Sequence, residues 1–241
     1  MSAVYTYSKS LDEVSNGDLA DSNANQTDPA NNKTEWGPSD YDTRNRFVAT
    51  ALWEAPHVHS SNAFLTAVAD GWQINGTYTK HSGFPFTPVT YNLTTSAYVL
   101  GSGVVSPTRP LSYTGGAVYG CSNGLFTNGG DFPNGGESYF DITPPANSHA
   151  YVPGIGRNSF SGPCFQDVDL SFAKQFTHDF GDHHSVLRIQ ANMYNPFNIL
   201  QLEPITNGNA NPGANITNQY FGYAQGADAG RVIEFLARIQ F

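Results

Sequence analysis

The most constraining feature of the sequence is a set of six segments in which apolar and polar side chains alternate. Alternation at every second residue is typical of a β-strand with two unlike faces. The segments are residues 2–9, 43–54, 71–82, 165–176, 186–197 and 230–241. Each is about as long as the 9–11 residues with which a tilted strand crosses a bilayer. The pattern therefore predicts an all-β chain of about six long strands.

The links between these segments alternate in length. Long polar or Gly/Pro-rich stretches follow the first, third and fifth segments, whereas shorter links, residues 55–71 and 177–185, join the others. The first short link contains a helical turn that we expect to begin at Ser61 or Asn62 and to end at Gly71. Outer-membrane barrels combine long extracellular loops with short periplasmic turns. Links longer than about 12–15 residues are uncommon in a compact sandwich, so the alternation favours a barrel.

Composition narrows the class of protein. Charged residues make up 13% of the 241 residues, against about 25% in an ordinary soluble domain. The net charge is −9, which argues against nucleic-acid binding because such proteins carry clustered Lys and Arg. No apolar run is long enough for a transmembrane helix. Because no signal peptide precedes the first segment, we expect the chain to be the C-terminal part of something longer.

The two faces of the predicted strands differ in what they can contact. In a membrane barrel the apolar face meets lipid and the polar face lines the lumen. A polar lumen accommodates charged groups in the middle of strands. The residues predicted to face it are Arg44, Arg46, Gln73, Asn75, Asp167, Asp169, Arg188, Gln190 and Arg238. We expect Asp167 and Asp169 to bond to Arg188 on the next strand rather than to serve as an acid/base pair.

Aromatic residues stand near the ends of the apolar faces. If the short links are periplasmic, an interfacial girdle is predicted there from Trp53, Trp72, Phe172 and Phe241. The chain also ends on Phe241, with apolar residues at alternating positions before it. This ending resembles the assembly signal of bacterial outer-membrane proteins, which implies a role in recognition by the barrel-assembly machinery for Ile233, Phe235, Ala237, Ile239 and Phe241.

Other residues with metal-binding or redox chemistry give weak signals. Histidines at 57–59 and 178–184 lack the spacing of a zinc site, and the segment around Asp131 lacks the spacing of a calcium loop. We expect no metal or cofactor site and no enzymatic activity. Cys121 and Cys164 could form a disulfide or remain two thiols. The aromatic side chains of the long link, such as Tyr113 and Phe140, could bind a ligand or pack on one another.

Several stretches, taken in order, resemble one known family. They are "YTYSKSLDE", "SDYDTRNRFVATALWEAP", "GWQINGTYTKHSGFPFT", "GRNSFSGPCFQDVDLSFAKQF" and "NMYNPFN". Together they look like the C-terminal barrel of TonB-dependent receptors, and in particular the Oar-like, Acidobacteria-type receptors with a carboxypeptidase-regulatory-like domain. The resemblance covers most of residues 1–241 except the interiors of the long links.

The resemblance implies a barrel of roughly 22 strands with a plugged lumen, of which this chain would supply the last six. The plug and the earlier strands would belong to a missing N-terminal part. The implied function is uptake of an unidentified extracellular ligand, with partners that include outer-membrane lipid and the TonB complex, reached through that missing part.

Two other functions share the same sequence features. A secreted, lectin-like β-sandwich would also have aromatic side chains, Asn/Gly-rich loops and few charges. In a sandwich, Trp72, Ile74, Leu187 and Ile189 would meet across two facing sheets, whereas in a barrel they would form an outward apolar belt. A porin-like or adhesive barrel without energy coupling would differ only in the missing N-terminal part.

Overall fold

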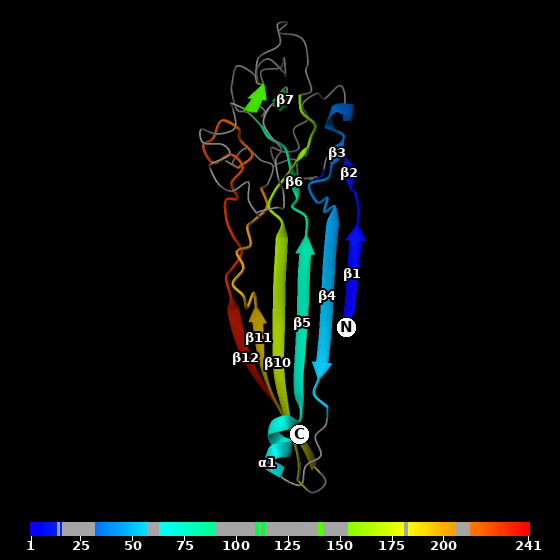
Figure 1. Ribbon diagram of the computed structural model, residues 1–241, viewed down its shortest axis with the longest axis vertical. Helices are drawn as coiled ribbons and strands as arrows, with labels where there is room; N and C mark the ends of the chain where they lie inside the picture. Colours follow the sequence, from blue (N-terminus) through cyan, green and yellow to red (C-terminus); the bar gives the residue numbers. More distant parts are fainter. Residues whose placement is uncertain are drawn as a thin grey trace.

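A computed structural model describes residues 1–13, 15, 32–56, 63–89, 109–110, 112–113, 139–141, 154–180, 183–205 and 213–241. Its main element is one antiparallel sheet with the strand order β1-β4-β5-β10-β11-β12. Figure 1 shows these strands side by side along the long axis. They are β1 (Ser2–Tyr7), β4 (Asn45–Glu54), β5 (Trp72–His81), β10 (Phe165–Phe180), β11 (His183–Tyr194) and β12 (Val232–Gln240). Each coincides with one predicted segment, which confirms the predicted all-β antiparallel fold.

The register of the strands sorts side chains into two unlike faces. Directly opposed residues of an antiparallel pair lie on the same face. One row across five strands therefore shares a face and is wholly apolar: Trp53, Ile74, Phe172, Ala191 and Phe235. The next row lies on the other face, and its polar members come from three different strands: Glu54, Gln73 and Gln190. We call these the apolar face and the polar face.

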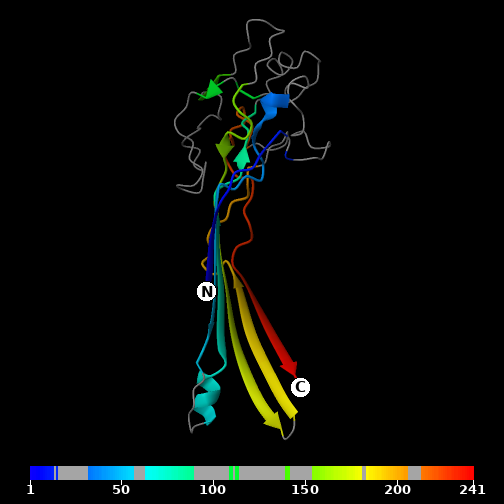
Figure 2. The ribbon, with the colours of Figure 1, turned by 90° about the vertical axis from the view of Figure 1, so that its right-hand side faces the viewer.

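The sheet does not close into a barrel. Among the described residues, β1 pairs only with β4 and β12 only with β11, so each leaves one edge open. Figure 2 shows the sheet bending, with β10, β11 and β12 leaning away from β1, β4 and β5. In the part of the chain that the structure describes there is no second sheet facing this one. Trp72 and Ile189 are exposed, so the apolar side chains do not meet across a sandwich.

One predicted turn is mostly strand. We expected residues 177–185 to form a turn because they are rich in His, Asp and Gly. In the structure β10 and β11 stay paired as far as Phe180 opposite His183, so only residues 181–182 separate them. Backbone pairing does not require apolar side chains, so the polar end of a hairpin carries the same sequence signal as a loop. The other short link contains the helix α1 (Ala63–Ala69), close to the predicted bounds.

Small elements gather at the opposite end of the sheet from α1 (Figure 1). They are three two-stranded antiparallel sheets, β2 (Leu11–Asp12) with β3 (Gly37–Pro38), β6 (Pro85–Phe86) with β9 (Phe160–Ser161), and β7 (Ser112–Tyr113) with β8 (Phe140–Asp141), beside the 3-10 helix η2 (Asn32–Glu35). We call the described parts of the three long links, residues 8–44, 82–164 and 195–231, the loop cap. The sequence did not predict these small sheets, because strands of two residues have no readable period.

The loop cap has a hydrophobic core of its own. Its buried members are Phe86, Phe140, Phe160, Ile205, Ala214, Ile216 and Phe221, with Val89, Tyr113, Tyr139 and Ile155 packed against them. Backbone hydrogen bonds from Val89 to Ala214 and from Ile216 to Val89, both 2.9 Å long, join two of the links. For Tyr113, Tyr139 and Phe140 the packing interpretation of the loop aromatics is therefore confirmed. Tyr91, Tyr98, Tyr119, Phe126 and Phe132 lie outside the described residues.

Candidate functional site

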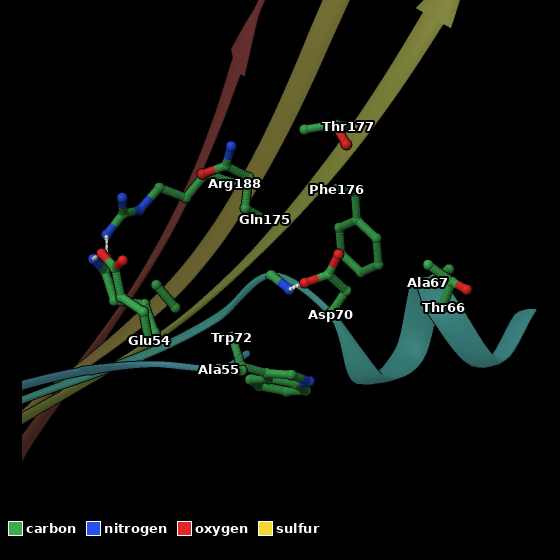
Figure 3. A pocket seen from close by; sticks show the side chains of 13 residues that line it. Glu54, Ala55, Thr66, Ala67, Asp70, Trp72, Gln175, Phe176, Thr177 and Arg188 are labelled. Carbon is green, nitrogen blue, oxygen red and sulfur yellow. Dashed lines mark hydrogen bonds between the residues drawn. The ribbon is translucent and has the colours of Figure 1, made fainter. Parts of the chain in front are cut away.

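A hydrogen-bonded network crosses the polar face near the α1 end of the sheet. The Gln73 amide donates to Glu54 Oε1 at 2.9 Å, and Arg188 Nη2 donates to Gln73 Oε1 at 2.7 Å. Figure 3 shows the Arg188 side chain extended toward the strand end that carries Glu54. Because these residues belong to β4, β5 and β11, the network joins strands that are far apart in the sequence.

The network continues along β11 toward the loop cap. Arg188 Nε donates to Gln190 Oε1 at 3.1 Å, and the Gln190 amide donates to Asn192 Oδ1 at 2.7 Å and to Ser171 Oγ at 3.0 Å. Ala173 lies opposite both Gln73 and Gln190 and is buried beneath them. Its small side chain leaves the space in which the polar groups of β5 and β11 meet above β10.

A cavity of about 660 Å³ lies beside this network, between the polar face and α1. Gln73, Gln175 and Arg188 line it from the sheet, and Thr66 and Asp70 line it from the helix segment. Figure 3 shows Asp70 and Thr66 on the α1 side, across from Arg188. The lining combines one cation with carboxylate, amide and hydroxyl groups, and it also includes the aromatic side chains of Trp72 and Phe176.

The expected bonds from Arg188 to the two aspartates are wrong. Asp169 stands opposite Tyr194 in the register, whereas Arg188 stands opposite Gln175. Six residues of strand, about 20 Å at about 3.4 Å per residue, separate the two positions. Asp167 Oδ1 instead accepts a 2.6 Å hydrogen bond from the Gln201 amide. The aspartates therefore belong to the loop-cap end of the polar face.

The register places the other residues predicted to face the lumen on the same side of the sheet. Arg46, Asn75 and Arg238 all lie on the polar face with Gln73 and Arg188. Arg44 precedes β4 and forms an ion pair with Asp42, at 3.0 Å. This hydrogen bond raises the pKa of the Arg44 guanidinium above its usual value. That the polar face lines a lumen stays a prediction.

The apolar face carries the residues that were predicted to meet lipid and to guide assembly. Ile233, Phe235, Ala237 and Ile239 share it, and all four are exposed; Phe241 follows the end of β12 and is exposed as well. Of the predicted girdle, Trp53 and Phe172 occupy one row of the apolar face. Trp72 occupies the next row of the same face, two residues closer to α1. The assembly signal and the girdle stay predictions about how this surface is used.

Arginine and asparagine side chains tie the loop cap together. Arg157 forms an ion pair with Asp12 and donates to the carbonyl oxygens of Asp12 and Glu35, both at 2.8 Å. A second ion pair, Arg109 with Glu35 at 3.3 Å, is buried. These contacts fix the link after β5 against the link after β1. Sequence reasoning quoted Arg157 only as part of a motif, and a single Arg in a Gly-rich link gives no further signal.

Asn158 is the most buried polar residue of the loop cap, at 2% exposed. Its φ of 53° is in the left-handed region, which Asn tolerates better than most residues. The backbone nitrogen donates to Thr87 Oγ1 at 2.9 Å, and the Thr87 hydroxyl donates back to Asn158 Oδ1 at 3.0 Å. The amide nitrogen donates to the Pro38 carbonyl oxygen at 2.8 Å. One side chain thus connects two of the three links.

The described residues offer little redox or metal chemistry. Cys164 is disulfide-bonded. The chain's other cysteine, Cys121, lies outside the described residues, so its pairing with Cys164 stays one of the alternatives that the sequence leaves open. Within the described ranges no group of three or more His, Cys, Asp or Glu residues is placed to hold a metal ion. His57–His59 and Asp131 also lie outside these ranges. No helix among the described residues is long and apolar enough to span a membrane.

Comparison with known proteins gives one result. Neither the curated proteins nor the solved structures contain a match to the chain. A family model described as an outer membrane beta barrel domain matches residues 1–234. This match agrees with the open six-stranded antiparallel sheet and its two unlike faces. The chain therefore belongs to the outer membrane beta barrel domain family and is a protein of the bacterial outer membrane.

Proposed function

We propose that the chain is the C-terminal part of the barrel of a TonB-dependent receptor, and that the whole protein takes up a ligand still to be identified. In this proposal the six strands form a passive wall, and the loop cap forms the rim at which the ligand is captured. The energy-coupled step and the plug belong to a part of the protein that precedes this chain. None of these residues acts as a catalyst.

The observation that carries the proposal is the network from Glu54 through Gln73 to Arg188. Charged and amide groups on the inner wall of a barrel need water or a polar partner, because an unpaired buried charge is costly. Small barrels fill their interior with their own side chains, whereas wide barrels leave a channel or hold a plug. A polar wall beside a cavity of about 660 Å³ suits the inner surface of a wide barrel that surrounds a polar plug.

The loop cap supports the second half of the proposal. Its Phe-rich core and its ion pairs hold three links that are distant in sequence, and a preorganised surface binds a ligand with a smaller loss of conformational entropy. The described ion pairs, such as Arg109 with Glu35, form between residues of the cap. These ion pairs support a structural role for their residues, so we expect other residues of the cap to contact the ligand.

Single-channel recording of the full-length protein separates this proposal from a porin-like barrel. A receptor with a plugged lumen should show almost no constitutive conductance in planar bilayers and should retain the C-terminal domain of TonB in a pull-down. A stable open conductance together with no retention of TonB would support the porin-like alternative and contradict the proposal.

A further inference from the structure

The helix α1 exposes a set of large apolar side chains. Phe64 is 73% exposed, Leu65 53% and Val68 50%. Positions 64, 65 and 68 of an α-helix lie on one side, because residues four apart are stacked and adjacent residues differ by about 100°. The segment Ala63–Ala69, "AFLTAVA", contains no charged residue. Exposed apolar side chains clustered in this way mark a contact surface.

The opposite side of the helix is turned toward the sheet. Thr66, Ala67 and Asp70 line the cavity together with Gln175 and Arg188 of the polar face. Figure 3 shows Thr66, Ala67 and Asp70 on the cavity side of the helix segment. The stripe of Phe64, Leu65 and Val68 therefore points away from this cavity.

Two residues of the apolar face hold the end of this helix. The Trp72 indole donates to the Val68 carbonyl oxygen at 2.8 Å, and Lys174 Nζ donates to the carbonyl oxygens of Val68, at 3.3 Å, and Asp70. The last carbonyl groups of a helix lack partners within it and favour a cation nearby. Lys174 stands opposite Trp72 and Ile189 on the apolar face, yet it is buried. The helix thus covers a cation that would otherwise face lipid.

The hydrogen bond from Trp72 to Val68 places the end of the exposed stripe beside a larger apolar surface. Trp72, Phe176, Ile189 and Ile239 are all exposed on the apolar face at this end of the sheet. In outer-membrane barrels this face meets lipid, and short links lie at the periplasmic side. A short helix with exposed apolar side chains beside the end of such a face lies at the height of the lipid headgroups of the inner leaflet.

We propose that α1 is an interfacial helix that inserts Phe64, Leu65 and Val68 into the phospholipid leaflet on the periplasmic side of the outer membrane. Lys174 and Trp72 set its orientation by binding its C-terminal carbonyl groups. The partner is the boundary between headgroups and acyl chains, and it is met by the same apolar surface that continues along the sheet. The inference depends on the outer-membrane location and not on TonB coupling.

Depth-dependent quenching of the full-length protein tests the proposal. The variant Leu65→Cys and its matched control Thr66→Cys are each labelled with an environment-sensitive fluorophore, and the native disulfide is not reduced. A sample of the unsubstituted protein is treated in the same way to measure background labelling. The proteins are then reconstituted in vesicles of phosphatidylethanolamine and phosphatidylglycerol that contain lipids with a nitroxide near the headgroup. The label at 65 should be quenched several-fold more than the label at 66, with blue-shifted emission. Equal, weak quenching at both positions would overturn the proposal.

A second pair of variants tests the anchor. Lys174→Met should reduce the quenching of the label at 65, because the helix end loses its cation. Lys80→Met removes a lysine from the same face near the loop cap, where it stands opposite Phe47, and should leave the quenching unchanged. Unchanged quenching in Lys174→Met would contradict the anchoring role. A different result would be that nitroxide lipids do not quench the label at position 65, while added periplasmic protein shields it. That result would show that α1 binds a protein and not lipid, and it would overturn the proposal.

Discussion

Arg188 on β11 donates a 2.7 Å hydrogen bond to Gln73 on β5 and crosses the strand that lies between them. The crossing is possible because the residue of β10 below this contact is Ala173, whose side chain is short and buried. The polar face is therefore tied together over the width of three strands. This tie is a property of the sheet order, and neither residue reveals it in the sequence.

The first prediction concerns the hydrogen bond from Arg188 to Gln73. Arg188→Gln should lower the free energy of unfolding of the full-length barrel by about 1.5–3 kcal/mol, the range for hydrogen bonds to charged groups. Arg238→Gln, the matched control on β12 directly opposite Arg188, should cost less because Arg238 is exposed. Denaturant titration of both variants in lipid bilayers measures the difference. Equal effects would mean that the bond to Gln73 contributes nothing.

The second prediction concerns the core of the loop cap. Phe86 is fully buried against Phe160 and Phe221, with ring centroids 6.0 and 6.5 Å away. Phe86→Ala should destabilise the cap by about 3–5 kcal/mol because it leaves a cavity, while Tyr41→Ala at an exposed position should have little effect. Limited proteolysis of intact cells should cut the cap of the Phe86 variant much faster. Unchanged cleavage would show that this core does not hold the links.

How much of the fold could be predicted from the sequence depends on how far apart in the chain the interacting residues lie. The six long strands were predictable because each carries its own two-residue period, as Trp72, Ile74 and Tyr78 do in β5. The contact of Phe86 with Phe221 was not predictable, because it joins two irregular links whose paths are set by tertiary packing.

The polar face shows the same limit. The alternation of polar and apolar residues is enough to predict which residues lie on the polar face. Their partners depend on strand order and register, which is why the bonds from Asp167 and Asp169 to Arg188 were predicted wrongly.

The third prediction concerns topology. A protease added to intact cells should cut within residues 92–147 or 207–228, which belong to the long links, and should spare residues 177–185 at the other end of the sheet. Long links of outer-membrane barrels are extracellular, so only they are accessible from outside. Mass spectrometry of the released peptides identifies the cleavage sites. Cleavage within residues 177–185 in sealed cells would invert the topology.

The fourth prediction concerns the end of the chain. Phe241 follows the last paired residue of β12, so its loss should hardly change the stability of the assembled barrel. If it is part of the assembly signal, its deletion or Phe241→Asp should strongly reduce the amount of full-length protein in the outer membrane, whereas Phe241→Trp should be tolerated. Quantitative blotting of sucrose-gradient fractions measures this amount. A normal amount of the deletion variant in the outer membrane would show that Phe241 is not part of the assembly signal and acts only as an interfacial anchor.

The account depends most on the assignment of the apolar face to lipid and of the polar face to the interior. Ile74 and Thr77 lie on opposite faces of the same strand, three residues apart. The measurement that tests the assignment most directly is the free energy of unfolding, in bilayers, of the full-length Ile74→Arg and Thr77→Arg variants. The account predicts a cost of about 2–4 kcal/mol for arginine at position 74 and almost none at position 77, where Asp169 stands opposite. Equal costs at the two positions, or a larger cost at position 77, would contradict it.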